Sequence, residues 1–442
     1  MRTSSSTDLR RQIRDNAYPG YVYGYPHKKA YRPLDPPLDL REVWADEDRD
    51  NLFCYVHIPF CTQRCSFCNL FTYVPGDTSP SEAYVTALAS EMDLVAEALA
   101  PARFARLYIG GGTPTYLTTP ELRRLVGALR TSLGVVPENT AGCIECSPET
   151  LDAEKVEALR ELGFRRISLG VQSFREEELR QVNRRFDPRL HDEAIRLIGR
   201  ANFAHFNLDL IYGLPGQTLD TWRDSLERAI DSPATSLFLY PLYVRPLTGL
   251  GVRPMLGSPS THAMAAMYDH ARDRLARAGF RQMSMRQFRR DDSDEDSEYR
   301  CERHGMLGLG AGARSYSHGL HYSTPWKMVA RNIRAVIEDY VARMRADDTR
   351  VSHGFALDED ERRRRAMIQS LLFNGLRLAV FDDDPRVTFP DEFGALREEG
   401  LVIEDEASIR LSPTGVKHAD IVGQLFFSER VLASMAEFEY DT

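Results

Sequence analysis

Long apolar stretches are missing from this 442-residue sequence. No run approaches the roughly 20 apolar residues that a membrane-spanning helix needs. The first twenty residues, MRTSSSTDLRRQIRDNAYPG, also lack the apolar core of a secretory signal. Cysteine is scarce, and its count of seven is odd, which is atypical of a disulfide framework. We therefore expect a cytoplasmic protein that does not enter a membrane.

The chain also lacks an excess of positive charge. It has 56 Lys and Arg against 65 Asp and Glu, which gives a formal net charge of −9. A general nucleic-acid binder needs a basic surface for phosphate contacts, so this class is not expected. The charge balance is still compatible with a local basic pocket for a small anionic substrate. No internal repeat of fixed period is present.

What the sequence does contain is an alternation of strand and helix patterns after a Tyr-, Pro- and Arg-rich arm over residues 1–50, which we expect to be extended. Between residues 51 and 250, six apolar runs predict strands at 53–58, 106–112, 142–148, 166–174, 206–213 and 236–244. The helices between them are predicted at 81–100, 119–132, 150–162, 188–202 and 218–231. Parallel strands need helical crossovers, so the fold class is α/β, a partial (β/α)6 barrel related to the TIM barrel.

Two further segments follow the barrel. Residues 251–355 are expected to extend it, with a strand at 280–288 and a glycine-rich turn between short strands at 305–324. Residues 356–442 predict a small winged-helix-like domain. Its elements are helices at 360–377 and 390–400, a β-hairpin from 401 and a last helix at 415–438.

Three of the seven cysteines lie together in the stretch HIPFCTQRCSFCNLFTYV, at Cys61, Cys65 and Cys68. Pro59 excludes a helix there, so the thiols lie on a loop after the first strand of the barrel. Two kinds of metal site fit three thiols. A structural zinc site would take His57 as its fourth ligand. An iron–sulfur cluster would bind three irons through the thiols and leave the fourth iron open.

Other polar groups are predicted at the same mouth of the barrel. The run GGGTPT (110–115) follows the second strand, where glycines let a backbone approach a ligand closely. Glu145 ends the third strand, Gln172 ends the fourth, and Asp209 lies on the fifth. Carboxyl ends of parallel strands meet on one face, where α/β barrels build their sites. The sequence therefore predicts a site that combines the cysteine loop, the glycine run and these polar groups.

The motifs CTQRCSFC (61–68) and GGGTPT (110–115) resemble those of the radical S-adenosylmethionine (SAM) superfamily. The stretches YVHIPFC, GVQSF, VNR (182–184) and NLDLIYGLPGQT resemble its branch of oxygen-independent coproporphyrinogen III oxidases, related haem chaperones and similar methyltransferases. The resemblance covers roughly residues 50–430. The arm YPHKKAYRPL (25–34) resembles a subgroup of that branch and not the oxidases or chaperones themselves.

The resemblance implies a [4Fe-4S] cluster and SAM, with a second SAM molecule if the enzyme is a methyltransferase, and reduction by a flavodoxin or ferredoxin. SAM would chelate the open iron and be cleaved to a 5′-deoxyadenosyl radical that abstracts hydrogen from a substrate. Matching positions give the cluster ligands Cys61, Cys65 and Cys68. They give the SAM contacts Gly111, Gly112, Thr113, Glu145, Gln172, Arg184 and Asp209, with Tyr55 and Phe67 packed around the cluster and adenine. Of these, Tyr55 and Arg184 are the candidate catalytic residues.

Two departures bear on the reaction within that branch. The oxidases carry a cysteine where this chain has Leu70, which weakens a simple assignment to coproporphyrinogen oxidation. The chaperones carry a His-Asn…Tyr-Trp motif where this chain reads YRCERHGMLGLG (299–310), so only His304 remains of it. We expect an enzyme similar to the coproporphyrinogen oxidases, with a SAM-dependent methyltransferase as the alternative and a haem carrier as the least favoured. The substrate is expected to be a tetrapyrrole or another anionic aromatic compound.

A last group of residues has either a functional or a purely structural explanation. The arm cations and aromatics could cover the barrel mouth and bind substrate, or the tyrosines could simply pack on the barrel. Further candidates for substrate binding lie near the late glycine turn: Arg286, Arg314 and His321. Cys143 and Cys146 flank Glu145, but strand alternation puts them on opposite faces, so buried thiols are favoured over a second metal site. Cys54 and Cys301 have no predicted partner.

Overall fold

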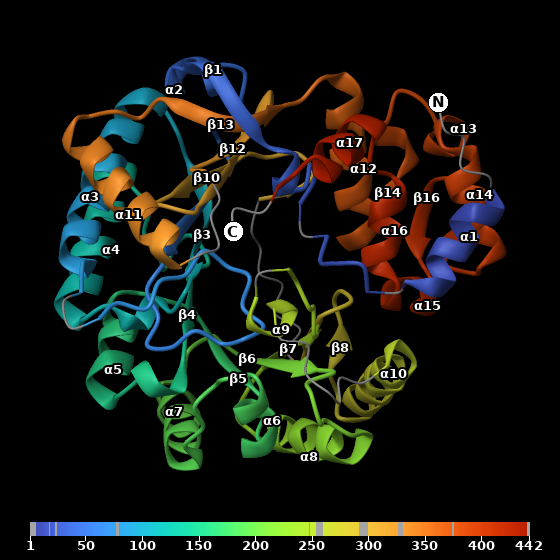
Figure 1. Cartoon of the computed structure of the whole chain (residues 1–442), viewed down its shortest axis with the longest axis horizontal. Coiled ribbons are helices and arrows are strands. Elements are labelled where there is room, and N and C mark those ends of the chain that lie inside the picture. Colours follow the sequence, from blue (N-terminus) through green and yellow to red (C-terminus); the bar gives the residue numbers. More distant parts are fainter. Residues whose placement is uncertain are drawn as a thin grey trace.

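The computed structural model of the chain describes residues 6–439 apart from 17, 23, 77–78, 247, 253–259, 291–298, 326–329 and 374. Its centre is a sheet of 13 strands in the order β1-β13-β12-β11-β10-β2-β3-β4-β5-β6-β7-β9-β8. The helices lie outside this curved sheet, and the C-terminal domain lies beside its open edge (Figure 1). No helix among these residues is long and apolar enough to cross a membrane.

Strands β2 to β7 are parallel neighbours and follow the chain order, as predicted for a partial (β/α)6 barrel. They are β2 (Leu52–Ile58), β3 (Phe104–Gly111), β4 (Cys143–Cys146), β5 (Arg166–Gln172), β6 (His205–Tyr212) and β7 (Ser236–Pro241). The covering helices are α3 (Ser81–Leu99), α4 (Thr119–Leu133), α5 (Ala153–Glu161), α6 (Glu176–Gln181), α7 (Pro188–Ala201), α8 (Leu219–Ile230) and α10 (Thr261–Arg277). A short helix, α9 (Gly249–Val252), follows β7.

Short strands extend the barrel at both edges. Strand β10 (Met306–Leu309) runs parallel to β2, and β11 (Arg314–Tyr316), β12 (Leu320–Ser323) and β13 (Val351–Ala356) continue antiparallel. This arrangement confirms the predicted glycine-rich turn between short strands. Helix α11 (Ala330–Arg345) connects β12 to β13. The strand predicted at 280–288 is instead a tight hairpin of β8 (Arg281–Gln282) and β9 (Gln287–Arg289), whose strands pair antiparallel.

The first 50 residues are not the extended arm that their prolines predict. Helix α1 (Ser6–Asp15) precedes the prolines and buries Leu9 and Ile13 against the C-terminal domain, while Arg10 donates to Glu399 at 2.7 Å. After it come the 3-10 turn η1 (Lys28–Ala30), the edge strand β1 (Arg32–Leu38), which pairs with β13, and α2 (Leu40–Val43). The arm is therefore extended only in part, because its first segment has a partner surface for an amphipathic helix.

The C-terminal domain combines helices with a three-stranded sheet, in agreement with the winged-helix-like prediction. The sheet has the order β14-β16-β15, and the predicted hairpin is its β15–β16 pair. The single last helix expected at 415–438 is instead three short helices, α15, α16 and α17, which are separated by turns. The elements are α12 (Glu359–Phe373), β14 (Leu376–Arg377), η4 (Leu378–Val380), α13 (Pro385–Thr388), α14 (Pro390–Glu398), β15 (Val402–Glu404), β16 (Ser408–Leu411), α15 (Pro413–Lys417), α16 (Ala419–Leu425) and α17 (Glu429–Ala436).

A buried ion pair joins this domain to the barrel. Arg286, in the β8–β9 hairpin, donates to both carboxylate oxygens of Asp420 on α16, at 2.8 and 2.7 Å. Tyr243 donates to the same carboxylate, and the amide of Val22 in the arm donates to it at 3.2 Å. Arg286 also stacks on the ring of Tyr21, 3.8 Å from its centroid. The guanidinium of Arg286 thus holds three segments together through Nη2, while its buried Nε has no hydrogen-bond partner, and its role in substrate binding stays a prediction.

Candidate functional site

The interior of the barrel is a hollow lined by polar and aromatic side chains. Along β2 the outward residues Cys54, Val56 and Ile58 are fully buried, whereas the inward Tyr55 is only half-buried. The same alternation holds for the inward Tyr108 of β3 and Tyr240 of β7. Outward residues lose their exposure under the helices. Inward residues keep some exposure, and the carboxyl end of such parallel strands is where α/β barrels bind their ligands.

The cysteine loop closes over one side of this hollow. Backbone hydrogen bonds fix it between strands: Cys61 donates to Tyr73 at 3.0 Å, and Ser66 donates to Val182 at 2.8 Å. Two of its thiols contact polar groups of other strands. The hydroxyl of Thr113 donates to Cys61 Sγ at 3.5 Å, and Nη1 of Arg184 lies 3.4 Å from Cys65 Sγ. The third thiol, Cys68, lies 4.0 Å from the hydroxyl of Thr72.

His57 is not available as the fourth ligand of a zinc site. It is buried, its Nε2 lies 2.8 Å from the carbonyl oxygen of Phe71, and its Nδ1 lies 3.1 Å from the hydroxyl of Tyr55. Burial also lowers its pKa to about 4. Within the described ranges, no set of three or more His, Cys, Asp or Glu side chains is arranged to hold a single metal ion. The zinc alternative therefore has no support from the geometry.

The glycine run after β3 is shaped by the cysteine loop. A Cβ at Gly112 would lie 2.6 Å from the carbonyl oxygen of Phe60 and 2.9 Å from Cys61 Sγ. Gly111 has a φ of 115°, and a Cβ there would lie 2.8 Å from the ring of His57. Both positions need glycine, because a side chain would displace either the loop or the histidine. The run thus lets the cysteine loop lie directly on the end of β3.

Two carboxylates face the hollow in the predicted positions. Oε1 of Glu145 accepts a 2.7 Å hydrogen bond from Tyr108, and its Oε2 accepts one from the Gly111 amide at 3.1 Å. Asp209 accepts from Asn207 at 2.7 Å and from Ser168 at 3.2 Å. Burial raises the pKa of Glu145 to about 7 and that of Asp209 to about 6. The charge of Asp209 also raises the pKa of Glu145, whereas the charges of Arg166 and Arg184 lower that of Asp209.

The remaining predicted residues lie around the same hollow. Nη2 of Arg184 donates to the Gly170 carbonyl at 2.6 Å and lies 3.3 Å from the hydroxyl of Ser147, while its buried Nε has no hydrogen-bond partner. Gln172 ends β5 with a φ of 70°, at a register shift between β5 and β6. Phe67 packs on a small apolar cluster that includes Val182 and Ile211.

The structure adds residues that the sequence did not single out. Tyr108 and Asn207 hold the two carboxylates in place, and Tyr55 stacks on Tyr108 with ring centroids 6.3 Å apart. The alternation of β3 and β6 could have identified both, because Tyr108 and Asn207 share the inward face with Gly110 and Asp209.

The structure also places the secondary candidates. Cys143 and Cys146 are buried thiols, as predicted; Cys143 lies on the same strand face as Glu145, and Cys146 belongs to the outer core. His321 is 1% exposed and its ring packs on that of Tyr316. Cys301 lies in a turn before β10, and burial and Glu302 raise the pKa of its thiol to about 12, which makes it an unreactive thiol.

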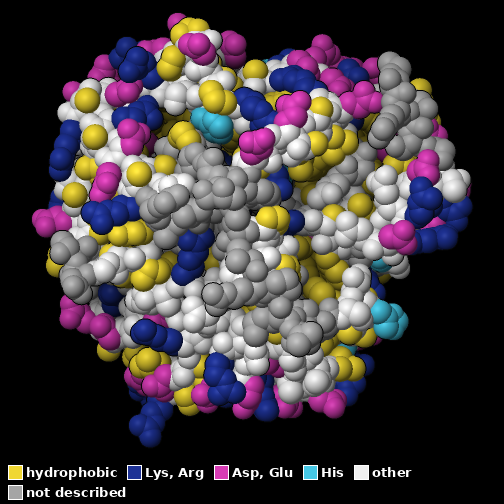
Figure 2. Space-filling view, viewed as in Figure 1, with side chains coloured by type: hydrophobic (Ala, Val, Ile, Leu, Met, Phe, Trp, Pro, Cys, Tyr) yellow, Lys and Arg dark blue, Asp and Glu magenta, His cyan; other side chains and the backbone are white. Residues whose placement is uncertain are grey.

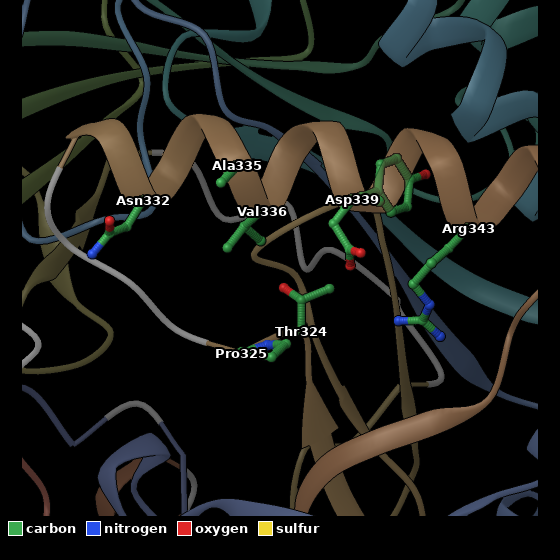
Figure 3. Close-up of a pocket in the computed structure, with 8 residues that line it drawn as sticks. Thr324, Pro325, Asn332, Ala335, Val336, Asp339 and Arg343 are labelled. Carbon is green, nitrogen blue, oxygen red and sulfur yellow. The ribbon is translucent and has the colours of Figure 1, made fainter.

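A separate pocket of about 410 Å³ lies between α11 and the segment after β12. Figure 3 shows Asn332, Val336, Asp339 and Arg343 projecting from α11 toward Thr324 and Pro325. None of the predicted site residues lines it. The pocket is therefore not part of the site at the barrel mouth.

Comparisons with known proteins agree with this geometry. Residues 55–229 match the radical SAM superfamily. The chain is 30% identical over 433 residues to an oxygen-independent coproporphyrinogen III oxidase of Pseudomonas aeruginosa, which covers 92% of this chain and 91% of that protein. The chain belongs to the coproporphyrinogen oxidase branch of the radical SAM superfamily. Other members of this branch are similar too: heme chaperone HemW of Bacillus subtilis is 28% identical, over 82% of this chain and 95% of that protein.

A protein of known structure has the same fold as this chain. Coproporphyrinogen III oxidase (HemN) from Escherichia coli superposes with a TM-score of 0.80 at 24% sequence identity, covering 92% of this chain and 97% of that one. The fold class predicted from the sequence is thereby confirmed.

Members of the radical SAM family bind a [4Fe-4S] cluster and SAM, and the residues present here fit both groups. Three thiols lie on one loop at the end of β2, and the nearby His57 is held by Phe71 and Tyr55. The buried Nε of Arg184, without a hydrogen-bond partner, lies beside this loop and suits a carboxylate. The pair of buried carboxylates, Glu145 and Asp209, suits a cationic sulfonium compound.

Proposed function

We propose that the protein is an enzyme that cleaves SAM reductively and abstracts hydrogen from an organic substrate. The observation that carries this proposal is the meeting of the three-cysteine loop, the glycine run and two buried carboxylates at one open barrel mouth. When bound, the cluster and SAM supply a hydrogen-abstracting 5′-deoxyadenosyl radical. The chain's own residues hold both groups and keep water away.

In this proposal, Cys61, Cys65 and Cys68 ligate the cluster through their thiolates. Each binds a different iron, which leaves one iron for SAM. Burial raises the pKa of Cys61 to about 12, so its thiol ionises only when metal replaces the proton. Arg184 supports this ligation because its positive charge acts on the Cys65 and Cys61 thiols.

The SAM contacts follow from the same geometry. Gly111, Gly112 and Thr113 would hold the methionine end of SAM through their backbone groups, because the run lies directly beside the cysteine loop. Arg184 binds the carboxylate of that end and is the candidate catalytic group nearest the cluster. Tyr55 and Phe67 enclose the cluster and adenine, and Tyr55 is the second catalytic candidate. Glu145, Gln172 and Asp209 bind the ribose hydroxyls and the ammonium.

Among the possible reactions, oxidative decarboxylation of a tetrapyrrole propionate is favoured, because the Pseudomonas relative is similar over nearly the whole chain. Methyl transfer with a second SAM beside Gly112 and Thr113 is the alternative. Its support is that Leu70, on the cysteine loop, stands where the oxidases have a cysteine. Leu70 is 47% exposed. Haem carriage is the least supported function, although HemW proteins are similar to this chain.

Product analysis tests the proposed function. Anaerobically reconstituted protein is incubated with SAM, dithionite and coproporphyrinogen III, and all nucleosides and tetrapyrroles are measured by mass spectrometry. The proposal expects 5′-deoxyadenosine. Release of CO2 with a decarboxylated tetrapyrrole indicates the oxidase reaction, and S-adenosylhomocysteine indicates methyl transfer. Stoichiometric haem binding without any SAM cleavage would contradict the proposal.

A pair of cysteine variants controls this experiment. Cys65→Ala should abolish both the cluster absorbance and the formation of 5′-deoxyadenosine. Cys301→Ala removes a half-buried thiol from a turn outside the barrel mouth and should leave both unchanged. Equal loss in the two variants would show that the effect is not specific to the cysteine loop.

A further inference from the structure

The arm brings cationic side chains to the barrel mouth and is fixed on both sides of them. Before them, Tyr25 donates to Glu361 of the C-terminal domain and accepts from the Ser428 amide at 3.2 Å. After them, β1 pairs with β13 at the edge of the large sheet. His27 and Lys28 lie between these two attachments. The buried Tyr25 and Tyr31 show that the arm's tyrosines pack, while its cations are only half-buried.

A second cation reaches the same place from the loop after β7. Nη1 of Arg245 donates to the carbonyl of Pro19 in the arm at 3.0 Å, and a Cβ at Gly20 would lie only 2.0 Å from Nη2. The same loop contacts the cysteine loop, because the amide of Leu250 donates to the Ser66 carbonyl at 2.9 Å. The segment after β7 therefore contacts the arm through Arg245 and the cysteine loop through Leu250.

A third cation comes from the late glycine turn. Arg314 is the first residue of β11, and a Cβ at Gly312 would lie 2.5 Å from the ring of Phe71, close in sequence to Cys68. On the other side, a Cβ at Gly24 of the arm would lie 3.1 Å from the Tyr316 hydroxyl. The turn that carries Arg314 is thus in contact with both the cysteine loop and the arm.

The charges of these residues act on one another. Burial, Arg314 and Arg245 lower the pKa of Lys28 well below its usual value, whereas the Cys68 thiolate acts in the opposite direction. Burial and the charges of Lys28 and Arg314 likewise lower the pKa of His27. Lys29, the next residue, is directed elsewhere, with its Nζ 6.0 Å from the centroid of the Phe438 ring.

We propose that Lys28, Arg245 and Arg314, with His27 beside them, bind a carboxylate or phosphate group of the substrate next to the cysteine loop. The inference rests on the proposed function and adds to it the class of substrate. Gathering like charges in a partly desolvated place costs free energy, and an anion at their centre relieves that cost. Arg supplies a planar fork and Lys a point charge, a combination that suits either anion.

The position of this group has a chemical consequence. An anion anchored beside Cys68 holds the rest of the substrate over the barrel mouth, where a neighbouring C–H bond faces the site of hydrogen abstraction. A neutral analogue of the same shape would lack this anchor. The site therefore selects anionic substrates by charge and fixes which carbon reacts by distance from the anchor.

Binding of a charged and an uncharged probe to the reconstituted holoenzyme tests the proposal. The probes are coproporphyrin III, which carries four carboxylates, and its neutral tetramethyl ester, followed by porphyrin fluorescence with detergent held constant. Inorganic pyrophosphate as a competitor distinguishes phosphate from carboxylate recognition. The variants are Lys28→Met and Arg314→Met, with Lys29→Met as the matched control in the same turn. Formation of 5′-deoxyadenosine without substrate is measured in parallel.

The expected result is that the acid binds and the ester does not, and that each of the two site variants weakens acid binding about tenfold. Lys29→Met should bind as the unchanged protein does. Competition by pyrophosphate at micromolar concentration would assign the site to phosphate, and its absence would assign it to carboxylate. SAM cleavage without substrate should persist in Lys28→Met, which separates this test from that of the proposed function. Equal binding of acid and ester, or loss of SAM cleavage with unchanged acid binding, would overturn the proposal.

Discussion

The backbone amide of Gly111 donates a 3.1 Å hydrogen bond to Oε2 of Glu145. This bond joins the glycine run after β3 to the carboxylate of β4 and fixes the orientation of both at the barrel mouth. Tyr108 donates to the other oxygen at 2.7 Å, so the carboxylate has little freedom to turn away. The proposed SAM site thus has a preorganised anionic group on its inner wall.

The first prediction concerns this carboxylate. Glu145→Gln keeps the shape of the side chain and removes its charge, so we expect the Kd for SAM to rise about tenfold or more. The iron content should stay unchanged, because Glu145 lies on β4 and not on the cysteine loop. Equilibrium dialysis of the reconstituted protein with labelled SAM measures the effect.

Glu91→Gln is the matched control for this change. Glu91 is a buried carboxyl of α3 that accepts from Tyr340 at 2.7 Å and from the Gly310 amide at 2.8 Å. Burial raises its pKa to about 7, as it does for Glu145, but Glu91 lies on the outer side of the sheet. SAM binding should not change in this variant. Equal losses in both variants would place Glu145 outside the SAM site.

The pH dependence of SAM binding should follow the buried carboxyl groups. Burial raises the pKa of Glu145 to about 7 and that of Asp209 to about 6, so both groups ionise between pH 5 and 8. The cationic SAM favours the ionised forms, and its affinity should therefore increase as the pH rises through this range. Glu145→Gln should flatten the profile, and an equally steep profile in this variant would contradict the assignment.

The same pKa shifts make the stability of the fold depend on pH in the opposite direction to SAM binding. The folded protein holds these protons more tightly than the unfolded chain, whose carboxyl groups have pKa values of about 4. The contribution of Glu145 and Asp209 to the free energy of unfolding should therefore fall as the pH rises from about 4 to 7. Urea unfolding of the metal-free protein at pH 5 and 7.5 measures this, and Asp209→Asn should reduce the difference.

Gly112→Ala should damage the cluster site without touching a ligand. The added methyl group would lie 2.6 Å from the Phe60 carbonyl oxygen and 2.9 Å from Cys61 Sγ, so the cysteine loop must shift. We expect a clear loss of bound iron after reconstitution. Gly127→Ala is the control, because no atom lies within 4 Å of its added methyl group. This change in helix α4 should keep the iron and stabilise the fold by about 0.5–1 kcal/mol.

The ion pair of Arg286 and Asp420 should be essential for docking of the C-terminal domain. Asp420→Asn leaves the arginine charge buried and uncompensated, which costs about 3–5 kcal/mol. Asp269→Asn is the control, because Asp269 pairs with Lys417 across the same two domains but is 40% exposed. Loss of that pair should cost less than about 1 kcal/mol. Equal effects on thermal unfolding would contradict this view of the junction.

Much of the barrel could be predicted from the sequence because its strands are local and regular. The six apolar runs became β2 to β7 with ends that differ by a few residues. The cysteine spacing and the glycine run were also local signals, and both lie where the strand order requires. The roles assigned to Glu145, Gln172 and Asp209 remain predictions, although all three lie at the barrel mouth.

Features that depend on distant partners could not be predicted. Helix α1 is stable because the C-terminal domain, nearly 400 residues later, covers Leu9 and Ile13. The ion pair of Arg286 with Asp420, at 2.7 Å, likewise joins residues that are far apart in the sequence. Surface charge does not mark a binding site either, because Lys and Arg are interspersed with Asp and Glu over the visible face (Figure 2). The contacts that bring the segments carrying Lys28, Arg245 and Arg314 together likewise form only in the folded chain.

The most direct test of the account is electron paramagnetic resonance of the reconstituted and reduced protein, before and after addition of SAM. The account predicts about four iron and four sulfide per chain and the signal of a reduced [4Fe-4S] cluster. That signal should change when SAM occupies the open iron, and 5′-deoxyadenosine should then accumulate. A signal that SAM leaves unaltered, with no nucleoside product, would contradict the claim that three cysteines leave one iron open for SAM.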